Sequence, residues 1–309
     1  MALDLAALTT FNNEVAGTLI PKMVYEGTTM EYVTVKEGIK YKEPINLFEV
    51  DLDIQDGYGC VATPAGTASF SQRDIQVCQR TSFDGLCLKD LDKYYLGISA
   101  LGAGSYNETF ALAQDYSDLI VNQFRKSNEN FVWGATTGAG DCVNGLKTII
   151  SGSTTGVVEA GGAATGSFTS ANALAIIDSM IEQIPTDVSD RDDLTVFMSV
   201  ASFRKYVAGI RQANSYWFDP NAITNRGGLM DMVHPFTNVR VVGTVGLEGS
   251  ARLVAGPARH IVVGTDTLSY LSEFQMWYDI NSDQLKHRVV FKLGVNIAYP
   301  EFWVSNDLA

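Results

Sequence analysis

The longest regular pattern of apolar and polar positions lies in residues 107–128 and predicts one amphipathic helix. Polar and charged residues follow the spacing of the apolar ones on the opposite face. Acidic residues near its start and a basic pair near its end agree with the helix dipole. Such a helix spans roughly 30 Å, so we expect the fold to be organised around it. Its apolar face is formed by Phe110, Ala113, Tyr116, Ile120 and Phe124.

A strict alternation of apolar and polar residues begins at Phe48 and predicts a strand with two unlike faces. A second extended run, residues 70–81, follows a segment rich in glycine and proline, so the two runs predict a long hairpin. The stretch before the hairpin, residues 30–43, is too short and too polar to form a core of its own. Since an isolated two-stranded hairpin is marginal in water, we expect this one to pack on another subunit.

The second half of the chain predicts a compact α/β unit followed by returning strands. Amphipathic helices are expected near residues 174–184 and 203–210, on either side of a buried strand at 194–200. Residues 215–232 are irregular in pattern, and short strands are expected after them. The tail alternates again from Leu285 onward and needs partners, so we expect it to return to the long helix. The α/β unit would then be an insertion.

The composition is that of a globular, acidic protein. The chain has 309 residues, with 35 acidic and 22 basic side chains and a formal net charge of −13. This charge is the wrong sign for a protein that holds nucleic acid tightly over its whole surface. The N-terminus lacks the basic start of a secretory signal, and no apolar run is long enough for a membrane span. We therefore expect a soluble protein made in the cytoplasm.

The cysteine spacing favours free thiols. Cys60, Cys78, Cys87 and Cys142 form no Cys-x-x-Cys pair of the kind used for zinc or redox chemistry. We expect all four to be unpaired.

Motifs for cofactors and catalysis are incomplete. The glycine-rich loop before Leu146 lacks the lysine of a phosphate-binding loop, and the glycines at 102 and 104 lack the third glycine of a dinucleotide fingerprint. His234, His260 and His287 have no metal-ligand spacing, and no Gly-x-Ser-x-Gly motif occurs. We expect no catalytic residue, no cofactor and no metal.

Two patterns indicate subunit contacts instead. The carboxylates on the charged face of the predicted hairpin outnumber its bases, which favours a basic partner on a neighbouring subunit. An aromatic segment around Trp217 has no convergent polar groups and is typical of an interface anchor. The residues expected at subunit interfaces are Glu49, Asp51, Asp53, Arg73, Arg80, Trp217 and Phe218.

The order of these elements resembles the major capsid protein of tailed bacteriophages, the Hong Kong 97-like fold. The resemblance is carried by the hairpin at 46–81, the helix at 107–128, the turn at 140–146 and the ending at 277–301. It implies an α+β fold. The implied parts are an N-terminal arm (1–44), an extended loop (45–85), a peripheral domain with a spine helix (86–160), an axial domain (161–266) and returning peripheral strands (267–309).

The resemblance also implies function and partners. The chain would be a non-enzymatic structural subunit of an icosahedral shell, assembled as hexamers and pentamers and located in the virion. It would enclose DNA without sequence-specific binding and without contact to a membrane. No lysine lies between Glu43 and Leu88, so a covalent self-cross-link through the loop is not expected. Without a long helical pro-segment, a separate scaffolding protein is expected, alongside portal and decoration proteins.

Two alternatives remain open. An encapsulin-like nanocompartment would have a similar outline and would package proteins instead of a genome. A metal-dependent α/β enzyme would use the acidic turn that contains Asp190 and Asp192. Loss of a metal-dependent activity on changing both residues to asparagine would support the enzyme.

Overall fold

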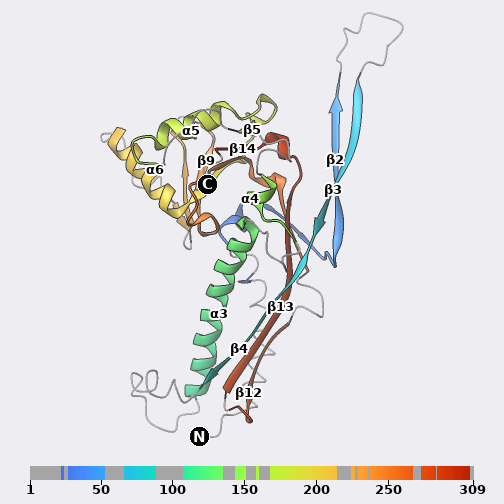
Figure 1. The fold of residues 1–309 in the computed structure, drawn as a ribbon, viewed down its shortest axis with the longest axis vertical. Coiled ribbons are helices and arrows are strands. Elements are labelled where there is room, and N and C mark those ends of the chain that lie inside the picture. The colour runs from blue at the N-terminus through green and yellow to red at the C-terminus, as the bar shows by residue number, and fades with distance from the viewer. Residues whose placement is uncertain are drawn as a thin grey trace, which may run out of the picture.

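The computed structural model describes residues 22–23, 27–52, 66–87, 107–134, 143–150, 158–159, 168–213, 224–226, 229–235, 237–266, 273–282 and 284–306. A five-stranded sheet, a seven-stranded sheet and a two-stranded ribbon organise this part of the chain. The two larger sheets form the body, one long helix runs beside the strands of the five-stranded sheet, and the ribbon projects away from the body (Figure 1). None of the helices described is long and apolar enough to cross a membrane.

The long helix is present as α3 (Asn107–Trp133), five residues longer than the sequence pattern predicts. Ile120 is buried and Asp118 is exposed, as the predicted faces require. The expected basic last turn is wrong, because the last turn of α3 has no basic residue and instead buries Phe131, Val132 and Trp133. These apolar side chains extend the helix because their burial in the core outweighs the weak dipole term.

The five-stranded sheet carries α3 on one face. The long strand β13 (Gln284–Ile297) pairs along one edge with β12 (Glu273–Asp279) and β11 (Ile261–Thr265), and along the other edge with β4 (Cys78–Cys87). β1 (Thr34–Glu37) adds in parallel to β11. The predicted apolar side of β13 is buried, and Phe291 meets Phe124 of α3 with ring centroids 5.6 Å apart. The expected return of the tail to the helix is confirmed.

The seven-stranded sheet is covered by the helices α5 (Ala173–Glu182) and α6 (Val200–Ala213), as the sequence predicts (Figure 1). The expected irregular structure throughout 215–232 is wrong, because one short strand lies within that range and a second begins in it. The strand order is β5 (Val158–Glu159), β14 (Val304–Ser305), β10 (Val254–Pro257), β6 (Leu194–Ser199), β9 (Arg240–Thr244), β8 (Leu229–Val233) and β7 (Thr224–Arg226).

The short elements connect these layers. The one-turn helix α4 follows Gly145, and the remaining pieces are 3-10 turns. These elements are α4 (Leu146–Ile149), η1 (Thr29–Glu31), η2 (Thr186–Val188), η4 (Val245–Leu247), η5 (Ala258–His260) and η6 (Pro300–Phe302).

Strand pairing does not follow the expected segment boundaries. β11 lies within 161–266 but pairs with β13, and β14 lies within 267–309 but pairs with β10. One hydrophobic core also includes Trp133 of α3 and Phe197 of β6, whose ring centroids are 5.1 Å apart. The chain therefore crosses between the sheets more often than a single insertion requires. Strand partners are chosen by proximity in space, which sequence order does not reveal.

The second run of the predicted hairpin is interrupted. β3 (Thr67–Gln76) ends before Val77, and β4 then leaves the hairpin to pair with β13. The sequence of residues 86–101 predicts a short helical connector. Leu86 and Cys87 are instead the last two residues of β4, and residues 88–101 lie outside the described part of the chain.

The expectation of four free thiols is wrong at Cys78, which is disulfide-bonded. Cys87 is free and partly exposed, and Cys60 and Cys142 lie outside the described residues. Sequence spacing could not reveal the bond, because a disulfide depends on two Cα atoms coming within about 4.4 to 6.8 Å in space.

Alkylation tests this assignment. In denatured, unreduced protein we expect iodoacetamide to modify Cys87 and to spare Cys78, and we expect both to react after reduction. Peptide mass spectrometry measures the two sites separately. Modification of Cys78 without reductant would show that the bond is not formed.

Candidate assembly surface

The predicted hairpin is present as an antiparallel ribbon that leaves the body of the molecule (Figure 1). β2 (Lys42–Asp51) pairs with β3 in a continuous register from Lys42 opposite Gln76 to Asp51 opposite Thr67. The inner half is anchored, since Ile75 is buried with Val77 and Ile39. The outer half has no covering element among the residues described, and the tip at 53–65 lies outside them.

One face of the outer half is apolar and open to solvent. Phe48 is 51% exposed and the facing Phe70 is 79% exposed, with their ring centroids 4.4 Å apart. Val50 and Leu52 extend this strip and are 45% and 73% exposed. Single exposed apolar residues are common on proteins, but a contiguous strip of four indicates a contact surface.

The opposite face carries the acidic residues. Glu49 and Asp51 are exposed, and Ser69 Oγ donates a 3.4 Å hydrogen bond to Glu49 Oε2. Their cross-strand neighbours are Ser69 and Thr67, so no base lies directly opposite either carboxylate. Asp53 lies outside the described residues. The ribbon is therefore two-faced, with an uncovered apolar side and a carboxylate side.

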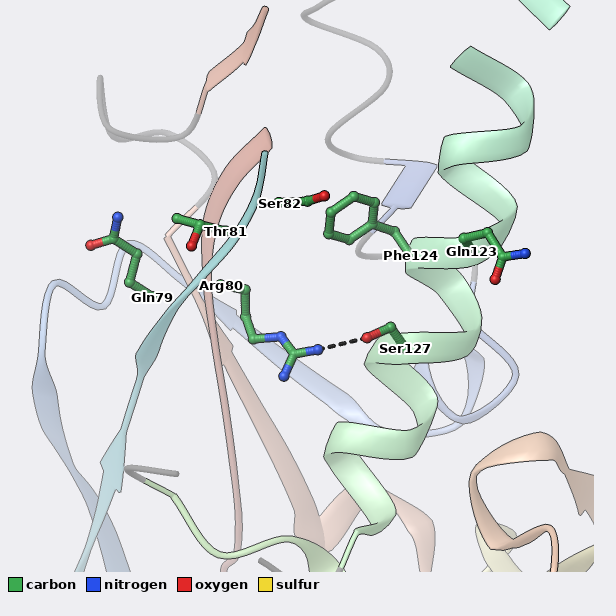
Figure 2. Close-up of a pocket in the computed structure, with 7 residues that line it drawn as sticks. All are labelled: Gln79, Arg80, Thr81, Ser82, Gln123, Phe124 and Ser127. Atoms are coloured by element: carbon green, nitrogen blue, oxygen red, sulfur yellow. Dashed lines mark hydrogen bonds between the residues drawn. The ribbon is translucent and has the colours of Figure 1, made fainter. Parts of the chain in front are cut away.

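The two arginines expected at an interface make contacts within the chain. Arg73 Nη2 donates to Asn296 Oδ1 at 3.4 Å. Arg80 lies on β4, outside the ribbon, and points toward α3, where its Nη2 donates to Ser127 Oγ at 2.7 Å (Figure 2). Its guanidinium also lies 4.5 Å from the ring centroid of Phe131. Trp217 and Phe218 lie outside the described residues.

A pocket of about 600 Å³ lies beside this arginine, between β4 and α3 (Figure 2). One wall residue, Ser82, has its Oγ 3.3 Å from His287 Nε2. The Nδ1 of this histidine lies 3.0 Å from the hydroxyl of Tyr116, and burial lowers the pKa of His287. A serine hydrolase would hold that nitrogen with a carboxylate, so the contact is not a catalytic triad. The lining residues are Gln79, Arg80, Thr81, Ser82, Gln123, Phe124 and Ser127.

A second histidine network is structural. His234 Nε2 lies 2.8 Å from Asp178 Oδ1, and its Nδ1 lies 2.6 Å from the hydroxyl of Tyr206. The three side chains follow the order of a catalytic triad, with a carboxylate, a base and a hydroxyl group. Tyr206 is fully buried, however, and burial raises the pKa of its hydroxyl. No substrate can reach the hydroxyl, so the network ties α5, α6 and the end of β8 together.

The acidic turn is not arranged as a metal centre. Arg191 donates two hydrogen bonds to Asp193, at 2.8 and 2.9 Å. Burial alone would raise the pKa of Asp193, but these bonds and the positive charge of Arg191 lower it. No group of three or more histidine, cysteine or acidic residues that could hold a metal occurs in the described part of the chain.

A buried carboxyl joins three segments of the body, and sequence analysis missed it. Glu129 Oε1 accepts from the main-chain N–H of Thr29 at 2.8 Å, and its Oε2 accepts from the hydroxyls of Thr29 and Thr244 at 2.6 and 3.0 Å. Trp133 Nε1 donates to the same Thr29 hydroxyl at 2.7 Å. The N-terminal segment, the end of α3 and the end of β9 therefore meet at one carboxyl group. An acidic residue on a helix predicts exposure, so the sequence gives no signal for this site.

Glu129 should contribute a distinctive pH dependence to stability. Burial raises its pKa, although the bonds from Thr29 and Thr244 act in the opposite direction. A carboxyl with a raised pKa in the folded state favours folding below its unfolded pKa, and that contribution is lost as the pH rises through the folded value. The stability of the natural protein should therefore rise relative to Glu129→Gln as the pH is lowered below neutral. Denaturant midpoints at several pH values measure this difference, and a gap that is constant or shrinks on acidification would contradict it.

No protein-family model matches the sequence, and no curated protein is significantly similar to it. Solved structures nevertheless share its fold. The capsid of an empty GTA particle is 10% identical and is matched over 90% of this chain and 88% of its own, with a TM-score of 0.55. The satellite phage P4 procapsid, which includes a size determination protein, is 12% identical over 93% and 89%, with a TM-score of 0.58. A virus-like particle from Pyrococcus furiosus is 9% identical over 96% and 98%, with a TM-score of 0.54. The chain thus has a mixed α/β fold found in the subunits of protein shells.

Proposed function

We propose that this chain is the structural subunit of the icosahedral capsid of a tailed double-stranded DNA bacteriophage. The observation that carries the proposal is the projecting ribbon, whose aromatic strip lies uncovered in a fold otherwise found in shell proteins. A marginal two-stranded ribbon with an apolar face is stabilised when that face is buried on another molecule. Many identical subunits provide such a surface to one another.

The parts of the subunit have corresponding roles in this proposal, which adopts the Hong Kong 97-like arrangement. The ribbon is the extended loop that lies over a neighbour. The helix α3 is the spine of a peripheral domain, and the seven-stranded sheet with α5 and α6 is the axial domain at the centre of a capsomer. The N-terminal segment up to residue 44 is an arm that adds β1 to the peripheral sheet.

The partners follow from the same proposal. The chain assembles as hexamers and pentamers, with separate scaffolding, portal and decoration proteins, and it has no catalytic role. The net charge of −13 suits a shell that encloses DNA without adhering to it. The P4 procapsid structure contains a size determination protein, which supports the idea of accessory assembly proteins.

Electron microscopy of the purified protein tests the function. Negative-stain images should show closed, uniform particles formed by this chain alone or with a scaffolding protein. A protein that stays monomeric across the accessible concentration range in both conditions would contradict the proposal.

A protein nanocompartment is the second candidate, because the likeness to the virus-like particle covers nearly all of both chains. The contents of particles isolated from the natural source distinguish the two. Packaged DNA supports the phage capsid, and packaged protein without DNA supports the nanocompartment.

The carboxylate face of the ribbon gives a further prediction. Replacing Glu49, Asp51 and Asp53 together with lysine should leave a folded subunit that closes shells poorly, because three charges are reversed at every contact. Each exposed pair contributes only about 0.2 to 1 kcal/mol, so the single changes should be mild. Circular dichroism reports folding and sedimentation reports assembly. Shells of normal size and stability from the triple variant would remove this face from the interface.

A further inference from the structure

Where the ribbon leaves the body, it crosses two glycines of the five-stranded sheet. Gly264 of β11 and Gly294 of β13 are paired in register. A Cβ atom on Gly294 would collide with the main-chain oxygen of Gln76, and one on Gly264 would lie 2.9 Å from Ile39 Cδ1. At position 294 only glycine permits so close an approach of the main chain, so the end of β3 crosses directly over the sheet.

Asn296, which follows Gly294 by two residues on β13, binds the main chain of β3. Its Nδ2 donates to the carbonyl oxygen of Asp74 at 2.7 Å. Its Oδ1 accepts from the main-chain N–H of Ile297 at 2.8 Å and from Arg73 Nη2 at 3.4 Å. Both ends of the amide are engaged, so the side chain is fixed with its donor toward the ribbon.

Tyr299 binds the main chain of β2 in a similar way. Its hydroxyl accepts from the N–H of Phe48 at 3.3 Å and donates to the carbonyl oxygen of Phe48 at 3.4 Å. These two groups lie on the outer edge of the ribbon, where an adjacent strand would otherwise pair. The ring is packed between His260 and Phe302, with centroids 5.1 and 5.8 Å away.

We infer that Asn296 and Tyr299 are positioning residues that set the direction in which the ribbon leaves the body. Asn296 holds β3 and Tyr299 holds β2, and each binds main-chain atoms of its strand. Asn296 also accepts from the Arg73 side chain. Asn296 and Tyr299 bind the ribbon near the end of its buried part. On β2, Leu47 is buried whereas Phe48 is largely exposed. The biological consequence rests on the proposed function, since a misdirected arm would not reach its neighbour.

Distance measurements on unassembled subunits test the inference. Spin labels are attached to p-acetylphenylalanine in place of Ser71 on β3 and Glu182 on α5, both exposed. The natural side chains should give one narrow distance distribution. In the Asn296→Ala, Tyr299→Phe double variant, the ribbon orientation seen in the structure should be roughly 5- to 30-fold less populated. The distance distribution should therefore broaden. The assembly rate measured by light scattering should fall with it.

A matched control removes a hydrogen bond inside the ribbon. Gln72 Nε2 donates to Asn46 Oδ1 at 2.9 Å, a bond between the two strands of the ribbon, so Gln72→Ala should keep the narrow distribution. An unchanged distribution in the double variant, or equal broadening in Gln72→Ala, would overturn the inference. The experiment separates the proposed function from the positioning role of the two residues. Absence of shells from the natural protein would count against the proposed function, whereas the distance distribution would still measure the orientation of the ribbon.

Discussion

Replacing Phe48 and Phe70 with serine is expected to leave a folded subunit that no longer assembles. Both rings are mostly exposed in the single chain, so their loss should change its stability little. In an assembled shell the same pair would be buried on a neighbour. Burial of two partly exposed aromatic rings stabilises each contact by about 2 to 4 kcal/mol, and that contribution would be lost at every contact in the shell.

The matched variant for this experiment replaces both residues with leucine. Leucine keeps an apolar face on the ribbon, so the leucine variant should still form shells, with lower stability than the natural protein. Sedimentation measures assembly, and circular dichroism with thermal unfolding measures folding of the subunit. Normal shells from the serine variant would show that the aromatic strip is not an intersubunit surface.

Trp133→Ala is expected to cause the largest loss of subunit stability. The side chain is fully buried, packs on Phe197 and donates to the Thr29 hydroxyl. It thus connects α3, the seven-stranded sheet and the N-terminal segment. Truncating a buried aromatic residue costs about 3 to 5 kcal/mol, and the Thr29 hydroxyl would also lose a donor.

Leu119→Ala is the control on the same helix. Leu119 is 64% exposed, so its truncation should change the free energy of unfolding by less than about 0.5 kcal/mol. Denaturant unfolding of unassembled subunits provides both values. Similar losses for the two variants would mean that the buried and exposed faces of α3 are assigned incorrectly.

Local pattern was sufficient for the long helix, the hairpin and the strand β13. Each has a periodicity of side chains that reports directly which face is buried, as Ile120 and Phe291 illustrate. The apolar strip at Phe48 was visible in the sequence as well. The exposure of this strip could not be predicted from the sequence, because an alternating strand has the same pattern whether its partner is in the same chain or in another.

Features that depend on distant contacts were missed. Glu129 is buried only because Thr29 and Thr244, 100 and 115 residues away, supply its donors. The contacts of Arg73 with Asn296 and of Arg80 with Ser127 join segments that are far apart in the sequence. The end of the hairpin was misplaced because β4 continues the same extended pattern while changing its partner to β13. Burial, hydrogen-bond partners and strand pairing of this kind depend on packing in three dimensions.

A cryo-electron microscopy map of assembled particles would show directly whether the ribbon joins neighbouring subunits. We expect density for β2 and β3 to extend from one subunit over a neighbouring copy, with Phe48 and Phe70 buried against it. Particles in which the ribbon folds back on its own subunit, or in which both rings stay exposed to solvent, would show that the ribbon is not an intersubunit arm.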